Sequence, residues 1–256
     1  MPPTPHTPLK RSNAVQRRPH AILSHASRLR KARKIELLLS AFSSLQGARI
    51  LEVGTGSGYM AQYFSERVGP TGRVHACDVM DQRQVTEGYE FQQIQDTRLP
   101  YQDDTFDIVI TNHVIEHVGE REAQIQHLQE IRRVLKPDGY VYLAVPNRWA
   151  FIEPHYKLLF LSWLPAPLSS IYLRLRGRGN FYDCRPLSHR SLTRLLHQTG
   201  FRFHQQTFAA ISVMRDLEQP HLSKPRRLAL SAPRFMLPAV YPVIPTLIMI
   251  LTPRSL

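Results

Sequence analysis

Ile50-Leu-Glu-Val-Gly-Thr-Gly-Ser-Gly-Tyr59 is the stretch of the sequence that decides the fold. Its apolar beginning predicts a short strand buried in a parallel sheet. Glycines then occupy positions 54, 56 and 58, and residues 59–67 are predicted to form a helix. A strand, a glycine turn and a helix make the first unit of a doubly wound α/β sheet, in which ligands bind where the strands end. Glycines suit this turn because they let a ligand lie against bare backbone.

The spacing of the glycines narrows the class of ligand. A dinucleotide or phosphate site favours G-x-G-x-x-G or G-x-x-x-x-G-K-[ST]. Here the pattern is E-x-G-x-G-x-G, and no lysine follows it. This form resembles motif I of the class I S-adenosylmethionine-dependent methyltransferases. The resemblance implies that Gly54, Thr55, Gly56 and Gly58 pass the methionine moiety of that cofactor, with Glu52 near its amino group.

Acidic residues end the second and third predicted strands. The second strand ends in Asp78, and an acid at this place commonly binds the ribose hydroxyls of a nucleoside cofactor. The third ends in Asp96, which opens a stretch similar to the family's D-x-x-x-L-P-F…F-D motif. The resemblance implies that Asp96 lies beside the adenine amino group. Val79 and Thr97, the residues that follow these two acids, are predicted to contact the cofactor with them.

Two further motifs extend the resemblance along the chain. Asn112 ends the fourth predicted strand, which faces the methyl group in this family. Residues 128–140 read L-x-x-I-x-R-V-L-K-P-D-G-Y, in which the lysine-to-glycine run is predicted to stop a helix before a fifth strand. This stretch closely resembles motif III of the ubiquinone-biosynthesis-like (methyltransferase type 11) group. The predicted strands cover residues 48–53, 73–78, 90–96, 106–112 and 140–145.

These patterns predict an α/β fold with a Rossmann-like doubly wound, mostly parallel sheet. An N-terminal helix and a helical lid insertion are expected to accompany it. The basic face of the N-terminal helix is interpreted as solvated. The expected divisions are a disordered basic, proline-rich tail at 1–20, the N-terminal helix at 21–46, the cofactor-binding core at 47–148, a substrate lid at 149–185, a last helix and strand at 186–219, and an apolar proline-rich tail at 220–256.

Charge and cysteine content limit the surroundings of the protein. Lysine and arginine outnumber aspartate and glutamate by 33 to 20, which favours a polyanionic neighbour, either an anionic membrane surface or nucleic acid. The second is disfavoured because no RNA-binding module is recognisable. Two cysteines give no disulfide framework and fit a cytoplasmic protein. Prolines disfavour a spanning helix in the tail, which is expected either to pack on the core or to lie at a membrane surface. No obligate protein partner is evident.

The stretch from His113 to His117 reads H-x-x-E-H and has three interpretations. The same letters form the signature of inverted zinc peptidases, in which they lie within a helix. They also resemble E-x-x-E-H, which binds a divalent ion in certain ubiquinone-pathway O-methyltransferases and small-RNA 2′-O-methyltransferases. This chain has His113 in place of the first glutamate, which leaves Glu116 and His117 as candidate metal ligands. In the third interpretation, these two residues only cap and line the following helix.

The expected reaction is in-line displacement of a methyl group from a sulfonium, in which the protein mainly aligns the reactants. A hydroxyl acceptor needs a base, and histidine titrates in the right range. His113 is the first candidate, His117 the second and His155, from the lid, the third. The sequence thus favours O-methylation of a small or lipid-linked acceptor. An RNA methyltransferase and a non-catalytic S-adenosylmethionine-binding protein are the alternatives.

Overall fold

The computed structural model describes residues 24–218 and 241–254. The tail expected at 1–20 and most of the tail expected at 220–256 lie outside this range. The strands are β1 (Arg49–Val53), β2 (Arg73–Asp78), β3 (Glu90–Gln93), β4 (Phe106–Asn112), β5 (Leu135–Pro146), β6 (Phe201–Gln205) and β7 (Thr246–Pro253). The helices are α1 (His25–Leu39), α2 (Tyr59–Ser65), α3 (Arg121–Val134), α4 (Ala166–Leu175), α5 (His189–Gln198) and α6 (Thr207–Glu218), with 3-10 turns η1 (Leu161–Trp163) and η4 (Tyr241–Val243).

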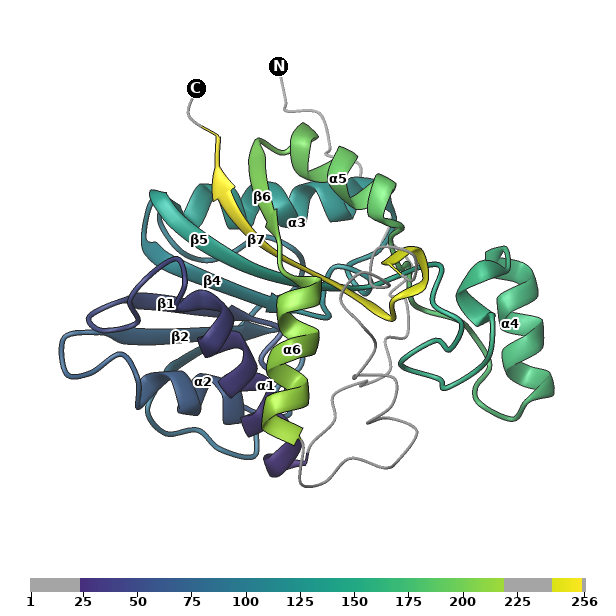
Figure 1. Cartoon of the computed structure of the whole chain (residues 1–256), viewed down its shortest axis with the longest axis horizontal. Coiled ribbons are helices and arrows are strands. Elements are labelled where there is room, and N and C mark those ends of the chain that lie inside the picture. Colours follow the sequence, from purple (N-terminus) through teal and green to yellow (C-terminus); the bar gives the residue numbers. More distant parts are fainter. Residues whose placement is uncertain (1–23, 219–240, 255–256) are drawn as a thin grey trace, which may run out of the picture.

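The strands form one sheet in the order β3-β2-β1-β4-β5-β7-β6 (Figure 1). Neighbouring strands from β3 to β5 are parallel, whereas β7 runs antiparallel to both β5 and β6. The chain therefore winds outward from β1 in two directions, which opens a crevice at the carboxyl ends of β1 and β4. This confirms the predicted doubly wound, mostly parallel sheet.

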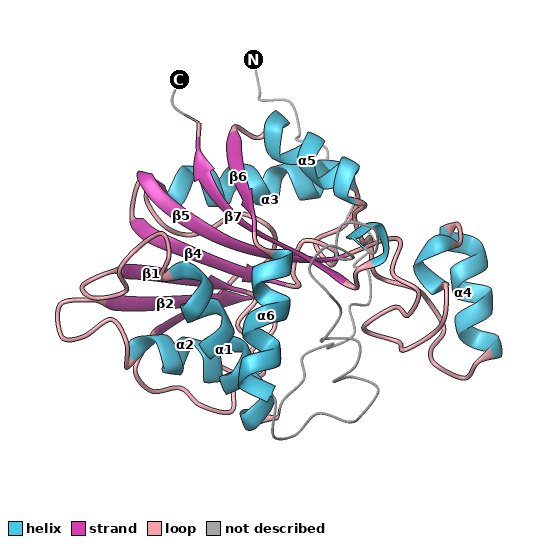
Figure 2. Ribbon diagram, viewed as in Figure 1, coloured by secondary structure: helices cyan, strands magenta, loops and turns pink. Residues whose placement is uncertain are grey.

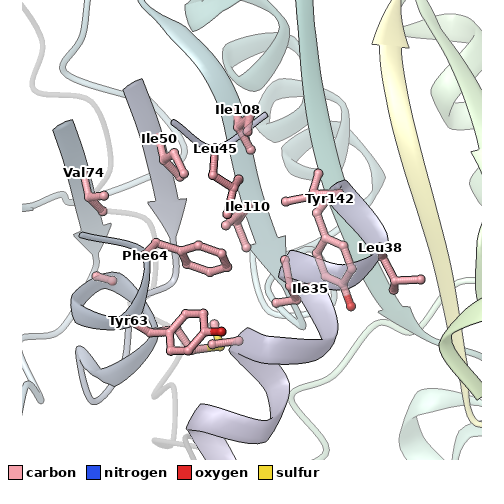
Figure 3. Close-up of a cluster of buried hydrophobic side chains, with 14 of the residues drawn as sticks. Ile35, Leu38, Leu45, Ile50, Tyr63, Phe64, Val74, Ile108, Ile110 and Tyr142 are labelled. Atoms are coloured by element: carbon pink, nitrogen blue, oxygen red, sulfur yellow. The ribbon is translucent and has the colours of Figure 1, made fainter. Parts of the chain in front are cut away.

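Helices cover both faces of the sheet because alternate strand residues point to opposite sides. Ile50 packs in a cluster with α1, α2 and α6, whereas its neighbour Leu51 packs in a second cluster with α3 and α5 (Figure 2). Figure 3 shows the first cluster, in which Ile35 and Phe64 meet the strand residues Ile110 and Tyr142. Complete burial of such a side chain contributes about 1.5–3 kcal/mol. The two clusters thus hold the crevice-forming strands in a fixed register.

The run from Lys136 to Gly139 lies inside β5 and does not precede it, which corrects the predicted strand start. Leu135 pairs with Phe106, and the next paired residue is Tyr140, so the run between them forms a bulge. The Nζ atom of Lys136 lies 2.6 Å from Oδ1 of Asp107 on β4 and fastens the bulge. Because a bulge leaves residues out of the hydrogen-bond ladder, proline is tolerated there.

The C-terminal apolar stretch contributes a strand to the sheet, which corrects its interpretation as a tail. Residues 246–253 form β7, whose side chains are buried on both faces from Leu247 to Leu251. A strand covered on both faces reads as a continuous apolar run. Pro242 and Pro245 precede the strand and Pro253 is its last residue, so no proline interrupts the buried run. Helix α6 was also not predicted; its Thr207 accepts a hydrogen bond from the backbone N–H of Ile248 at 2.9 Å.

The segment between β5 and α5 leaves the sheet as a projecting insertion that carries η1 and α4 (Figure 1). It has a small apolar cluster of its own, which includes Leu161 and Leu173. Helix α4 does not line the cavity described below; the insertion reaches that cavity only through Pro154, His155 and Lys157. Within residues 24–218 and 241–254, no helix combines the length and the apolar character needed to cross a membrane.

Candidate functional site

A cavity of about 780 Å³ lies at the carboxyl ends of β1, β2 and β4. Of the residues predicted to bind cofactor or acceptor, ten line it, and four (Glu52, Thr55, Gly58 and Glu116) do not. The predicted residues that line it are Gly54, Gly56, Asp78, Val79, Asp96, Thr97, Asn112, His113, His117 and His155. Segments far apart in the sequence therefore converge on a single space.

The glycine loop is shaped by close backbone approaches. Gly54 has φ +80°, and a Cβ atom there would collide with Val114. The backbone N–H of Gly56 donates a hydrogen bond to Oδ2 of Asp78 at 2.9 Å, and that of Met80 donates to Oδ1 at 3.2 Å. Asp78 thus ties the loop to the end of β2 and borders the cavity, as a ribose-binding acid must.

Glu52 lies behind the glycine loop with one oxygen unsatisfied. Its Oε2 accepts a hydrogen bond from the Thr55 hydroxyl at 2.7 Å, whereas its buried Oε1 has no hydrogen-bond partner among the residues that the structure describes. Burial raises the pKa of Glu52 from 4.5 to about 7, against the effect of the Thr55 hydrogen bond. A buried unpaired carboxylate oxygen is costly, and a ligand ammonium group would satisfy it. The arrangement therefore fits the amino end of S-adenosylmethionine.

We expect the contribution of Glu52 to the free energy of unfolding of the ligand-free protein to fall as pH rises from 4.5 to about 7. In that window the unfolded chain ionises Glu52 while the folded chain keeps it protonated, so the unfolded state binds fewer protons. A shift of this size corresponds to about 3 kcal/mol. Urea unfolding across the window measures the slope, which Glu52→Gln should reduce. An equal reduction by Glu122→Gln, at an exposed site on α3, would contradict the assignment.

Basic residues on one side of α1 line the cavity, contrary to the expectation of a solvated face. Arg28, Lys31 and Lys34 recur at helical spacing and border it. Burial, together with the charges of Arg28 and Lys34, lowers the pKa of Lys31 to about 8, while Glu116 opposes the shift. The sequence shows the spacing of these residues. Whether they face the cavity or solvent depends on how the apolar side of α1 packs on the sheet.

Glu116 and three histidines meet at the end of β4. The Oε1 atom of Glu116 lies 3.3 Å from Nδ1 of His113, 3.5 Å from Nε2 of His155 and 3.9 Å from Nε2 of His117. The Nε2 atoms of His117 and His155 are 3.3 Å apart. Glu116 is completely buried, and neither of its oxygens meets the geometry of a hydrogen bond with the described residues. The structure thus brings together all three predicted histidines.

The backbone turns His113 toward this group. Its N–H donates to the carbonyl oxygen of Ala144 at 2.9 Å, which extends the β4–β5 ladder by one step. Its φ is +60°, a left-handed conformation that bulky residues seldom adopt. Such strain is found at functional sites, where the surrounding structure enforces it. Residues 113–117 form bends and turns and not a helix, so the zinc-peptidase interpretation is wrong.

Glu153 holds His155 in place, a role that no sequence motif indicated. Its Oε1 lies 2.8 Å from Nδ1 of His155. Its Oε2 accepts hydrogen bonds from the backbone N–H groups of His155 and Tyr156 at 2.8 and 2.6 Å. Glu153 is almost fully buried, so its two oxygens fix both the ring and the loop. The only signal in the sequence was a lone acid two residues before a histidine.

The environment moves the pKa values of these groups in different directions. Burial lowers the pKa of His113, although Glu116 opposes the shift. Burial would also lower the pKa of His155, but the hydrogen bond to Glu153 and the charge of Glu116 raise it overall. Burial would raise the pKa of Glu116, but the three imidazoles bring it below its usual value. The lowered pKa keeps His113 in its neutral form near pH 7, the form that can accept a proton.

The same side chains could also hold a metal ion. His113, Glu116 and His155 offer donor atoms within 4.8 Å of one another, and so do His117, His155 and Cys184. The two predicted ligands, Glu116 and His117, are thus divided between two groups. Two imidazoles and a carboxylate suit zinc, iron or manganese. The buried oxygens of Glu116, which lack hydrogen bonds to the described residues, fit such an ion.

Comparison with known proteins gives the family. Residues 23–206 match the family described as Methyltransferase domain. The ubiquinone/menaquinone biosynthesis C-methyltransferase UbiE of Pseudomonas putida is 32% identical over 124 residues, which cover 44% of this chain and 45% of that protein. The protein of the same name from Cupriavidus metallidurans is 28% identical over 129 residues, which cover 46% of this chain and 52% of that protein. The chain thus matches about half the length of these relatives.

Solved structures share the fold. An S-adenosylmethionine-dependent methyltransferase from Mesorhizobium loti superposes with a TM-score of 0.56 at 13% identity, covering 84% of this chain and 95% of that one. Another, from Methanosarcina mazei, gives 0.52 at 15% identity, covering 85% and 98%. The similarity to these structures shows the fold, and the family match over most of the chain shows the evolutionary relationship. This chain therefore belongs to the family described as Methyltransferase domain and has the fold of the class I S-adenosylmethionine-dependent methyltransferases.

Proposed function

We propose that the enzyme methylates a hydroxyl oxygen of an acceptor that is partly apolar, such as a lipid-linked molecule, and negatively charged. The observation that carries this proposal is the pairing of His113, which lines the cavity, with the buried Glu116 behind it. An oxygen acceptor must lose a proton as it is methylated, and a neutral imidazole at the reaction site can accept it.

The protein's own residues divide the work as follows. Asp78 and the glycine loop hold the cofactor, which supplies an electrophilic methyl group. Nδ1 of His113 faces Glu116, which leaves Nε2 as the ring nitrogen toward the ligand. Glu116 fixes the orientation of the imidazole and stabilises its charge after proton transfer, as carboxylates do for catalytic histidines. His155 is held by Glu153 and contacts Glu116 from the side of the insertion.

The remaining cavity walls support an acceptor with apolar and anionic parts. Apolar side chains contribute much of the lining, among them Val118, Ile211 and Met214. Lys31 and Lys157 add positive charge, from α1 and from the insertion. A neutral apolar acceptor would leave these ammonium groups beside a dry surface, which is unfavourable. A phosphate, carboxylate or phenolate on the acceptor would compensate them.

A bound divalent ion is a second candidate role for the same cluster, favoured by the lack of hydrogen bonds to Glu116. His113, Glu116 and His155 would hold it, and it would lower the pKa of an acceptor hydroxyl as a Lewis acid. We expect cobalt(II) added to the chelator-treated protein to develop visible absorption bands in that case. Glu116→Gln should weaken its binding on the order of a hundredfold, with no change from Glu120→Gln at an exposed position. Absence of the bands, together with full activity in chelator, would leave His113 as the base.

Product analysis tests the proposed acceptor atom. The enzyme is incubated with S-adenosylmethionine carrying a ¹³C-methyl group and with matched acceptors: anionic lipid-linked hydroxyl compounds, their neutral analogues, and RNA with free ribose hydroxyls. We expect the ¹³C spectrum to show an O-methyl signal, strongest with the anionic lipid-linked compounds. A C-methyl or N-methyl product would contradict O-methylation, and methylated RNA would contradict the acceptor class.

A further inference from the structure

Exposed apolar side chains are concentrated in the projecting insertion. Within residues 24–218 and 241–254, ten large apolar side chains are exposed, and nine of them lie between residues 149 and 181. Single exposed leucines are ordinary on protein surfaces, but a concentration of this kind marks a site of interaction. The tenth, Leu37, lies on α1.

Helix α4 turns an apolar stripe toward solvent. Leu168, Ile171 and Leu175 recur at helical spacing and are 51%, 44% and 79% exposed. The opposite side of α4 is buried: the Ser169 hydroxyl donates to the carbonyl oxygen of Leu161 in η1 at 3.1 Å. The helix is therefore anchored through small polar residues and presents its large apolar ones outward, as an interfacial helix does.

An aromatic cluster adjoins the same helix through η1. Phe151 stacks on Trp163 with ring centroids 5.9 Å apart, and Phe160 lies 5.0 Å from Trp163. The backbone N–H of Phe160 donates to the carbonyl oxygen of Phe151 at 2.7 Å, so the loop that carries these rings is closed on itself. Phe151 and Phe160 remain nearly half exposed. Aromatic rings with one wet and one apolar side are favoured at membrane interfaces.

The charge of the insertion selects the kind of partner. Five basic side chains are exposed between residues 148 and 178, whereas the acid of that stretch, Glu153, is buried against His155. Basic residues beside an apolar surface attract anionic lipid headgroups, each contributing about 1 kcal/mol. The exposed bases are Arg148, Lys157, Arg174, Arg176 and Arg178.

We propose that the insertion docks on an anionic lipid bilayer through the outer stripe of α4 and the aromatic cluster. His155 and Lys157, in the same insertion, line the cavity, so docking would bring the catalytic site to the membrane surface. This inference concerns a surface and does not depend on the acceptor or on turnover. It goes beyond the proposed function in naming the partner.

Tryptophan fluorescence of the full chain reports on the insertion, because both tryptophans, Trp149 and Trp163, lie there. With vesicles of phosphatidylglycerol and phosphatidylcholine in equal parts, we expect a blue shift and quenching by brominated lipid. Vesicles of phosphatidylcholine alone should bind much more weakly. Sedimentation of vesicles without a change in tryptophan emission would place binding elsewhere in the chain and overturn the proposal.

Matched variants separate the apolar and charged contributions. Ile171→Ser with Leu175→Ser should lower vesicle affinity about twentyfold, whereas Leu37→Ser should leave it unchanged. Arg174→Gln with Arg176→Gln should lower it about twentyfold, whereas Arg190→Gln with Arg202→Gln, which removes equal charge elsewhere, should have a small effect. Equal losses in variants and controls would overturn the proposal. A lipid-free dimer that the α4 variants abolish would assign the surface to a second copy of the chain and would also overturn it.

Discussion

Replacing His113 by asparagine is expected to lower kcat by about two to four orders of magnitude, the usual contribution of a positioned general base. Asparagine cannot accept the proton, but it tolerates the left-handed backbone conformation of this position, so the turn after β4 is kept. Steady-state kinetics with a confirmed acceptor measure the change. Calorimetry should find the affinity for S-adenosylmethionine unchanged.

Two further variants serve as a control and as a second test of this prediction. His204→Gln, on the exposed side of β6, should retain activity and controls for loss of a histidine as such. Glu116→Gln should also lower kcat, because Oε1 of Glu116 lies 3.3 Å from Nδ1 of His113 and orients the ring. If His113→Asn keeps full kcat, the base lies elsewhere and the proposed proton transfer is wrong.

Replacing Asp78 by asparagine is expected to weaken S-adenosylmethionine binding on the order of a hundredfold. The carboxylate accepts from the N–H groups of Gly56 and Met80 and borders the cavity. An amide places an NH₂ group against one of those donors and removes the charge that strengthens hydrogen bonds to the ribose, each worth about 1.5–3 kcal/mol. Isothermal titration calorimetry gives the dissociation constant.

The matched control is Asp104→Asn, at an exposed site with φ +51° where asparagine is equally at ease. It should leave the dissociation constant unchanged. An unaltered affinity in Asp78→Asn would show that the ribose is held by other residues. A thermal unfolding curve for each variant separates loss of binding from loss of the folded state.

The cofactor half of the enzyme could be predicted from the sequence because its signals are local. A strand followed by a glycine turn depends on residues 50–59 alone, and Asp78 follows from its place at the end of the next strand. The structure confirms the predicted sheet, and Asp78, Asp96 and Asn112 line one cavity. The cofactor-binding half was therefore predictable from residues that lie close together in the sequence.

The C-terminal half depends on contacts between distant residues, and the sequence alone misled there. The partners of β7 are β5 and β6, and β5 lies about a hundred residues earlier in the chain, so nothing near Thr246 shows that the run is a strand. Phe201 to Phe208 alternates like a strand, which concealed the start of α6 at Thr207. Tertiary pairing, and not local propensity, decides both elements.

The cluster of Glu116 with three histidines was predicted in its residue types but not in its arrangement. The pattern from His113 to His117 indicated chemistry at the end of β4. That Glu153 orients His155 toward Glu116 follows from the path of the insertion, which no spacing reveals. The lysines of α1 were likewise assigned to solvent, because helical periodicity does not tell which side meets the sheet.

In the proposed reaction, the methyl-bearing end of the cofactor lies beside His113. Nitrogen NMR of the ¹⁵N-histidine-labelled protein tests it most directly, with His113→Asn assigning the signal. We predict that the imidazole resonances of His113 differ between the S-adenosylmethionine and S-adenosylhomocysteine complexes, which differ in the methyl group and the sulfonium charge. Those of the exposed His204 should coincide in the two complexes. Identical His113 resonances in both complexes would place methyl transfer away from this cluster.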